Sequence, residues 1–333
     1  MAGKSIVEVI IKYILIVICS TFYVAISAIG WFKSRNKPSR PINMKEEPSI
    51  LQDPALGKHG TIRLPGRNIE MHYVANGERS KPLMLLVHGF PEFWYSWRHQ
   101  LVEFSKDYYT VAIDMTGYGG STIPKDLGRY DSVEIAEDIK EFILALGYEK
   151  CTLVAHDWGA AVSFVVASNF GDVVEKLIIM NGPSGRGMAR CMSFTQLLKS
   201  SYMFFFAAPY LAEYVLGRDQ SSVLKLFNKA RKMLTDEEID AYRYMFTKNG
   251  FTGPLNYYRF ALLRRGRTVQ REIKAPTLII WGTADTALGK EVAAASGKDC
   301  TTCEIKYIEG STHWVNQEFP DEVNRLMRDY LKC

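Results

Sequence analysis

The sequence lacks the features of a secreted, disulfide-bonded protein. Its six cysteines are scattered, and no Asn-x-Ser/Thr sequon occurs. This cysteine usage is typical of a reducing compartment, and the missing sequon argues mildly against a luminal domain. Cys300-Thr-Thr-Cys303 has C-x-x-C spacing, but no second pair completes a zinc site and no thioredoxin-like context surrounds it. We interpret this pair as incidental.

Signatures of nucleotide and nucleic-acid binding are also missing. The glycine-rich loop Thr116–Ser121 does not have the G-x-G-x-x-G spacing of a dinucleotide site. The net charge of +5 belongs to residues 1–40, where six Lys and Arg oppose Glu8 and leave the remaining chain neutral. Because this charge only flanks one apolar segment, we expect no nucleic-acid partner. No motif indicates a cofactor, a metal ion or an obligate protein partner.

Charged residues are absent from Tyr13 to Phe32. A helix of about 20 residues spans about 30 Å, the thickness of a bilayer core. A cleavable signal peptide is the alternative, with Ala25 and Ser27 at small-residue positions, but its apolar region is usually only about 7–15 residues long. We expect an uncleaved single-pass anchor at 13–32 that contacts the lipid bilayer. The basic residues after it place the main domain in the cytosol, with the endoplasmic reticulum as the expected membrane.

Short apolar runs alternate with amphipathic segments over most of the remaining chain. Strands are expected at 61–64, 69–74, 83–87, 109–114, 174–180, 276–281 and 304–308, and in the run that ends at His156. This alternation indicates an α/β fold with a mostly parallel sheet flanked by helices.

Between about residues 184 and 267 the pattern is only helical, with helices expected at 193–200, 223–234, 236–246 and 255–263. A helical lid inserted into the α/β core explains this break better than a second domain. The expected organisation is a stalk at 33–55, the first part of the core at 56–183, the lid at 184–267 and the second part of the core at 268–333.

Residues 151–160 have the pattern of a nucleophile elbow. An apolar run ends at His156 and is followed by Asp157. Ala155 and Gly159 are small, as this kind of turn requires, because the strand and helix backbones nearly touch there. A carboxylate that attacks a saturated carbon leaves an ester, which water can hydrolyse, whereas serine would leave an ether. With a reference pKa of about 3.9, Asp157 needs no activating base at neutral pH. The alternative is an aspartate that only caps the following helix.

Hydrolysis of an aspartyl ester requires a general base and a group that orients it. Asp285 and His313 both follow expected buried strands, at the carboxyl edge where open α/β sheets place their sites. The order nucleophile, acid, histidine is that of α/β-hydrolases. The alternatives are a turn aspartate and a lone surface histidine.

Four motifs, in this order, resemble those of the epoxide hydrolases of the α/β-hydrolase superfamily. They are His88-Gly-Phe-Pro-Glu-Phe-Trp-Tyr-Ser-Trp-Arg98, His156-Asp-Trp-Gly159, Gly253-Pro-Leu-Asn-Tyr-Tyr-Arg259 and His313-Trp. The resemblance covers roughly residues 55–333, and the N-terminal anchor makes the epoxide hydrolase 3 and 4 group the most similar. It implies an α/β-hydrolase fold and conversion of epoxides to vicinal diols through a hydroxyalkyl-aspartate ester.

The resemblance also implies a role for each site residue. Asp157 would be the nucleophile, His313 the general base and Asp285 the residue that orients it. Tyr258 would protonate the epoxide oxygen, although it could instead be a core aromatic of the lid. Backbone N–H groups of Phe90 and Trp158 would form the oxyanion hole.

The sequence departs from the family pattern at three positions. Phe205 stands where a second lid tyrosine is expected, and Tyr202, one helical turn earlier, is a possible substitute. Ala155 replaces the usual elbow glycine, which the turn should tolerate, and Thr116 replaces an arginine. The first departure puts the rate of ring opening in doubt.

Lid composition bears on the substrate and on the rival functions. Its many aromatic residues predict an apolar pocket, suited to lipid-like or aromatic epoxides delivered from the bilayer.

A haloalkane or haloacid dehalogenase would also use an elbow aspartate, but it would need halide-binding tryptophans, and only Trp158 could serve here. A catalytically impaired, membrane-anchored binding protein is the third alternative.

Overall fold

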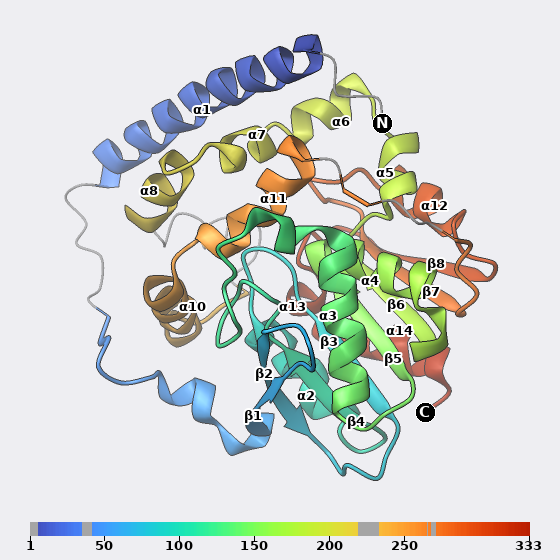
Figure 1. Ribbon diagram of the computed structural model, residues 1–333. Helices are drawn as coiled ribbons and strands as arrows, with labels where there is room; N and C mark the ends of the chain where they lie inside the picture. Colours follow the sequence, from blue (N-terminus) through green and yellow to red (C-terminus); the bar gives the residue numbers. More distant parts are fainter. Residues whose placement is uncertain (1–5, 35–41, 219–232, 265, 268–270) are drawn as a thin grey trace.

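The computed structural model describes residues 6–34, 42–218, 233–264, 266–267 and 271–333 (Figure 1). Its centre is an eight-stranded sheet of order β1-β2-β4-β3-β5-β6-β7-β8. The strands are β1 (Lys58–Arg63), β2 (Glu70–Asn76), β3 (Leu83–Val87), β4 (Tyr109–Ile113), β5 (Cys151–His156), β6 (Val174–Met180), β7 (Thr277–Gly282) and β8 (Cys303–Ile308). Only the pairings β1–β2 and β2–β4 are antiparallel. The predicted mostly parallel α/β fold is confirmed.

Helices cover both faces of this sheet. They are α2 (Arg98–Phe104), α3 (Ser132–Ala145), α4 (Asp157–Asn169), α12 (Glu291–Gly297), α13 (Val315–Glu318) and α14 (Pro320–Leu331). Helices α3 and α4 pack together in front of the sheet in Figure 1, and α2 and α14 pack together behind it. Because both faces are covered, β3, β5 and β7 are buried along their whole length.

In the described part of the chain between β6 and β7, the regular secondary-structure elements are helices joined by turns. They are α5 (Gly185–Arg190), α6 (Phe194–Lys199), α7 (Tyr202–Ala207), α8 (Leu211–Arg218), α10 (Asp236–Asn249) and α11 (Thr252–Leu263). A capping box between Thr235 and Glu238 starts α10. The predicted helix at 223–234 lies outside the described residues, apart from its last two. These helices lie over the carboxyl ends of the parallel strands (Figure 1).

Helix α1 (Ile6–Ser34) lies across α7 and α8 (Figure 1). Over Ile10–Ile29 it is long and apolar enough to cross a membrane. Ile16 packs with Phe204, Ala207 and Ala208 of the lid. The helix therefore contacts the domain that it was expected only to anchor.

The predicted stalk, 33–55, is too long at its C-terminal end. Residues Ser49–Gln52 form a 3-10 helix whose Leu51 is buried in the core. A ring nitrogen of His59 also hydrogen-bonds the carbonyl oxygen of Leu51 at 2.8 Å. Because Leu51 supplies an apolar side chain to the core, this part of the segment is fixed to the domain.

Candidate active site

The nucleophile elbow lies at the junction of β5 and α4. Asp157 has φ +50°, a left-handed conformation that costs a non-glycine residue energy and that is characteristic of such sites. A Cβ atom on Gly159 would lie 2.3 Å from the carbonyl oxygen of Val87, and one on Gly89 would lie 2.4 Å from Cβ of Asp157. Gly159 is therefore required by close backbone approach and Gly89 by its contact with the Asp157 side chain, whereas the buried Ala155 fits without such a restriction.

His313 lies between two carboxylates. Its Nε2 is 3.3 Å from Oδ2 of Asp157, and its Nδ1 donates to Oδ2 of Asp285 at 2.7 Å. Asp285 also accepts hydrogen bonds from the Asn181 side chain and from the backbone N–H of Leu288. This arrangement fixes the ring with Nε2 directed at the nucleophile, so the structure brings the three predicted residues together.

The electrostatics of this cluster favour an ion pair. Burial opposes the charge of His313, but Asp285 and the hydrogen bond with Asp157 outweigh it and raise the pKa of His313 well above its ordinary value. Burial likewise opposes the charge of Asp157, but His313 outweighs it and lowers the pKa of Asp157. Asp157 is therefore a carboxylate and His313 a cation before any reaction. Removing the charge of Asp157 would remove one of the two causes that hold the proton on His313.

The Phe90 N–H group donates to Oδ1 of Asp157 at 2.8 Å, which distinguishes the two carboxylate oxygens. Oδ1 occupies a hydrogen-bonding position of the oxyanion-hole type, and Oδ2 faces His313. Trp158 begins the first turn of α4, where backbone N–H groups lack helical partners. Its side chain also hydrogen-bonds Tyr258.

Two tyrosines of the helices between β6 and β7 lie near enough to Asp157 to be affected by its charge. Tyr258 of α11 is 3% exposed, and its ring centroid lies 5.4 Å from Phe90 and 5.1 Å from Trp158. The Tyr202 ring of α7 lies 6.2 Å from that of Tyr258. Burial, and then the charge of Asp157, raise the pKa of both hydroxyl groups. Both tyrosines are therefore protonated and can donate.

Phe205, the residue at the sequence position of the family's second lid tyrosine, packs against α1. The Phe205 ring stacks on Tyr23 of α1, with ring centroids 5.5 Å apart. Three residues before it, Tyr202 lies beside Tyr258 instead. The short helix α7 directs these two side chains to different neighbours, and only Tyr202 joins the site.

Sequence analysis missed a buried polar network behind the nucleophile. The Glu92 carboxylate accepts from Nδ1 of His156 at 2.8 Å and from the Gln317 side chain at 2.7 Å. The other nitrogen of His156 lies 2.9 Å from the carbonyl oxygen of His313. The network thus ties the elbow strand to the loop that carries His313.

In the sequence, the sign of this network was Glu92, the acidic residue of the His88–Arg98 motif. Glu92 lies in a buried loop, so its carboxylate cannot serve to solvate the surface. We expect Glu92→Gln to destabilise the fold by about 1–3 kcal/mol, because the amide NH2 group would face either Nδ1 of His156 or the Gln317 side chain and leave a buried donor without an acceptor. Thermal unfolding of the full chain measures this effect. Glu78→Gln is the matched control, since Glu78 is 74% exposed. An equal melting temperature for both variants would contradict the structural role of the network.

Among the described residues, no group of three or more His, Cys, Asp or Glu is arranged to hold a metal ion. The reactive groups of the site are thus a carboxylate, an imidazole and two phenols. This set can alkylate an aspartate, protonate a leaving oxygen and activate water.

Comparison with known proteins agrees with this geometry. Residues 82–320 match the family model described as alpha/beta hydrolase fold. The chain is 39% identical to epoxide hydrolase 4 of Homo sapiens, a match that covers 86% of this chain and 82% of the relative. It is 38% identical to epoxide hydrolase 1 of Caenorhabditis elegans, covering 93% of this chain and 79% of the relative. A crystal structure of the Bacillus megaterium epoxide hydrolase in complex with an inhibitor has a TM-score of 0.75 and 33% identity, covering 82% of this chain and 100% of that one. The chain therefore belongs to the α/β-hydrolase family and, within it, to the epoxide hydrolases.

Proposed function

We propose that this enzyme converts lipid-like or aromatic epoxides to vicinal diols through a covalent ester on Asp157. The observation that carries the proposal is the position of the Asp157 carboxylate, which has His313 Nε2 3.3 Å away and lies near enough to two lid tyrosines for its charge to raise their pKa. The proposed nucleophile thus comes from the α/β core, and the tyrosines that would protonate the leaving oxygen come from α7 and α11.

In the first step, Oδ2 of Asp157 attacks an epoxide carbon. A carbon–oxygen bond to Asp157 forms as the ring carbon–oxygen bond breaks. Tyr258, assisted by Tyr202, hydrogen-bonds the ring oxygen and transfers a proton to it. Oδ1 remains in its hydrogen bond with the Phe90 N–H group and becomes the carbonyl oxygen of the ester.

In the second step, the ester is hydrolysed. Esterification removes the charge of Asp157, so the pKa of His313 falls and its proton passes through solvent to the tyrosinate left by ring opening. Neutral Nε2 then takes a proton from water, which attacks the ester carbonyl, while Asp285 holds Nδ1–H. N–H groups of Phe90 and Trp158 stabilise the oxyanion by about 3 kcal/mol per donor, as in comparable sites. As the bond from the ester carbonyl carbon to the substrate oxygen breaks, that oxygen takes the proton from Nε2 and the diol leaves. The carboxylic acid left on Asp157 then returns a proton to His313, which restores the ion pair.

The aromatic surroundings support the proposed substrate class. The rings of Phe90, Trp158 and Phe206 each lie within 5.4 Å of the Tyr258 ring. We propose that residues 184–267 act as the lid that supplies this apolar wall. The dehalogenase alternative is less well supported because the Trp158 side chain, its only available indole donor, hydrogen-bonds Tyr258.

Single turnover in oxygen-18 water tests the proposal. We expect the first label in the Asp157 carboxylate, because water attacks the ester carbonyl and not the substrate carbon. Mass spectrometry of the peptide that contains Asp157 measures it, with a chain kept in labelled water without epoxide as the control. Label that enters the diol directly and leaves Asp157 unlabelled would mean that water opens the epoxide without an ester.

A further inference from the structure

Large apolar side chains on the surface are concentrated in two neighbouring segments. Among the described residues that expose such side chains, nine lie on α1 and six lie between residues 192 and 214 of the lid. The lid residues are Met192, Phe194, Leu197, Leu198, Tyr210 and Tyr214. Phe194 is 75% exposed and Tyr210 is 87% exposed, whereas the five remaining residues of this kind are scattered over the rest of the surface. Exposed apolar area gathered in one region marks an interaction surface.

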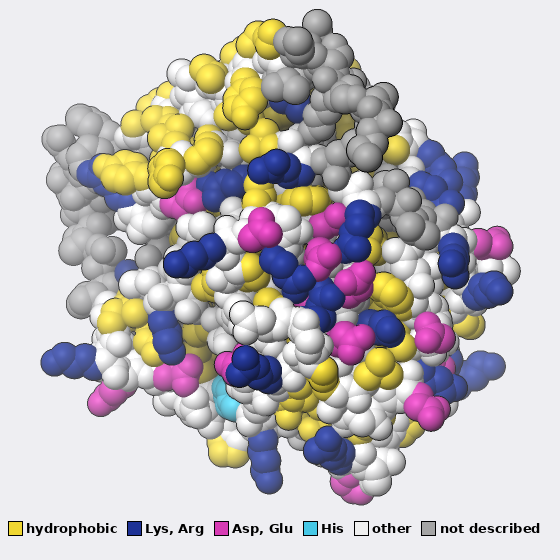
Figure 2. All heavy atoms as spheres, in the orientation of Figure 1, with side chains coloured by type: hydrophobic (Ala, Val, Ile, Leu, Met, Phe, Trp, Pro, Cys, Tyr) yellow, Lys and Arg dark blue, Asp and Glu magenta, His cyan; other side chains and the backbone are white. Residues whose placement is uncertain are grey.

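The two segments are continuous in space. Helix α1 packs along α7 and reaches α8, and Figure 2 shows hydrophobic side chains gathered over α1 in the upper part of the view. The Tyr23 hydroxyl lies 3.0 Å from the hydroxyl oxygen of Ser201, between α6 and α7. The exposed apolar surface of the lid therefore continues onto α1, which is long and apolar enough to cross a membrane.

Three polar residues of α1 are buried or half-buried. Lys12 donates through its ammonium group to the carbonyl oxygen of Leu262 at 2.8 Å, Ser20 is buried, and Tyr23 meets Ser201. These positions recur at helical spacing, while Ile14 and Ile18 lie exposed on other faces. If α1 left the lid, the Lys12 ammonium would lose this partner, which is costly within a bilayer. The contacts thus keep the lid with α1.

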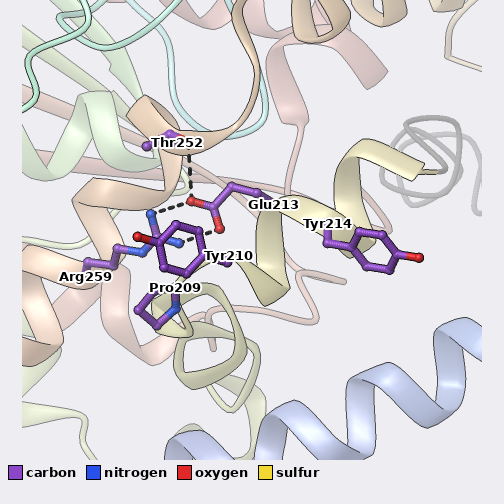
Figure 3. A pocket seen from close by; sticks show the side chains of 6 residues that line it. All are labelled: Pro209, Tyr210, Glu213, Tyr214, Thr252 and Arg259. Atoms are coloured by element: carbon purple, nitrogen blue, oxygen red, sulfur yellow. Dashed lines mark hydrogen bonds and ion pairs between the residues drawn. The ribbon is translucent and has the colours of Figure 1, made fainter.

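The charge of the lid segment suits an anionic membrane surface. Between residues 192 and 218 the basic residues are Lys199 and Arg218, and the one acidic residue is Glu213. Glu213 forms an ion pair with Arg259 at 2.7 Å, in an open pocket of about 540 Å³ that Tyr210 and Tyr214 also line (Figure 3). Arg259 neutralises the acid, and tyrosine is a residue that favours the headgroup level of membranes.

We propose that the lid segment 192–214 is a second membrane-contact surface, continuous with α1, which seats the lid in the headgroup region of a phospholipid bilayer. This inference rests on the proposed membrane attachment of the enzyme. The apolar side chains enter the boundary of the acyl chains, and Lys199 and Arg218 meet anionic headgroups. An apolar epoxide dissolved in the bilayer then meets the lid without crossing bulk water.

Photolabelling of the full chain tests this surface. The protein is reconstituted in phosphatidylcholine vesicles with about one-fifth phosphatidylserine and a phospholipid that carries a diazirine on its acyl chain. After irradiation, we expect lipid adducts on α1 and on the peptides that contain Phe194, Leu198 and Tyr214. Val102 and Leu144, exposed on α2 and α3, should remain unlabelled. Adducts confined to α1 would overturn the proposal and leave membrane attachment intact, and a chain without any adduct would overturn both.

A charged variant gives an independent measurement. Phe194→Glu with Leu198→Glu should reduce labelling of the Tyr214 peptide severalfold and leave labelling of α1 unchanged, because glutamate is disfavoured at the acyl boundary. Val102→Glu with Leu144→Glu is the matched control and should change neither. Hydrolysis of a water-soluble epoxide by each variant verifies that the chain is folded. Unaltered labelling of the lid in the first variant would show that Phe194 and Leu198 do not face lipid.

Discussion

The His313→Gln variant is expected to react once with an epoxide and then stop, gaining the mass of one substrate molecule on the peptide that contains Asp157. Asp157 is a carboxylate before the reaction, because the hydrogen bond and charge of His313 outweigh burial and lower its pKa. In the variant, the hydrogen bond from the Phe90 N–H group and His156 still favour the charged form of Asp157 against burial. Ester hydrolysis, in contrast, needs a base for water. Loss of general-base catalysis should slow turnover by about 10²–10⁴-fold. Intact-protein mass and peptide mapping measure the trapped ester.

Two further variants separate the roles around this ester. Asp157→Ala should form no adduct, because the attacking oxygen is gone. Asp285→Asn should form the ester but hydrolyse it slowly, since Nδ1 of His313 loses the carboxylate at 2.7 Å. A His313→Gln variant that folds but forms no adduct would show that the histidine is needed before the ester forms. Asp157 would then not be a preformed nucleophile.

Replacing both lid tyrosines, Tyr258→Phe with Tyr202→Phe, is expected to slow ester formation by about 10²–10⁴-fold. Phenylalanine keeps the aromatic packing and removes the two hydroxyl groups that can protonate the epoxide oxygen. We expect Tyr258→Phe alone to have the larger single effect, because its hydroxyl is more deeply buried and is also oriented by the Trp158 side chain. Rapid-quench measurement of the ester, rather than of the diol, isolates this step.

Tyr257→Phe is the control on the same helix. Tyr257 is equally buried, but its hydroxyl donates to the carbonyl oxygen of Thr116 at 2.7 Å, so its loss removes a hydrogen bond without removing an acid. Phe205→Tyr should give no increase in rate, because the Phe205 ring stacks on Tyr23. Unchanged ester formation in the double variant would mean that a group other than these two tyrosines protonates the leaving oxygen.

The clustering of Asp157, Asp285 and His313 could be predicted from the sequence because local rules determine where they lie. Steric limits at the elbow select small residues around Asp157, and Asp285 and His313 follow strands whose carboxyl ends meet at one edge. The short distance between Asp157 and His313 follows from this topology.

Which lid tyrosine enters the site could not be predicted in the same way. The direction of Tyr202 and Phe205 depends on how α7 packs between α1 and α11, segments that are far apart in the sequence. The network of Glu92 and His156 has the same origin, because its members are separated by 64 residues along the chain and meet only in the folded core. Periodicity within one segment carries no information about such contacts.

The hydrogen bond between Lys12 and Leu262 joins residues 250 positions apart, which has a consequence for biosynthesis. At about 5–20 residues per second, a ribosome needs roughly 10–50 s to add the lid after α1 has been made. During that interval α1 is an apolar helix without its protein partner. If a bilayer holds α1, the helices between β6 and β7 have to displace lipid from the side that carries Lys12, Ser20 and Tyr23. Docking of these helices on α1 is therefore a late step of folding, after translation of the N-terminal helix.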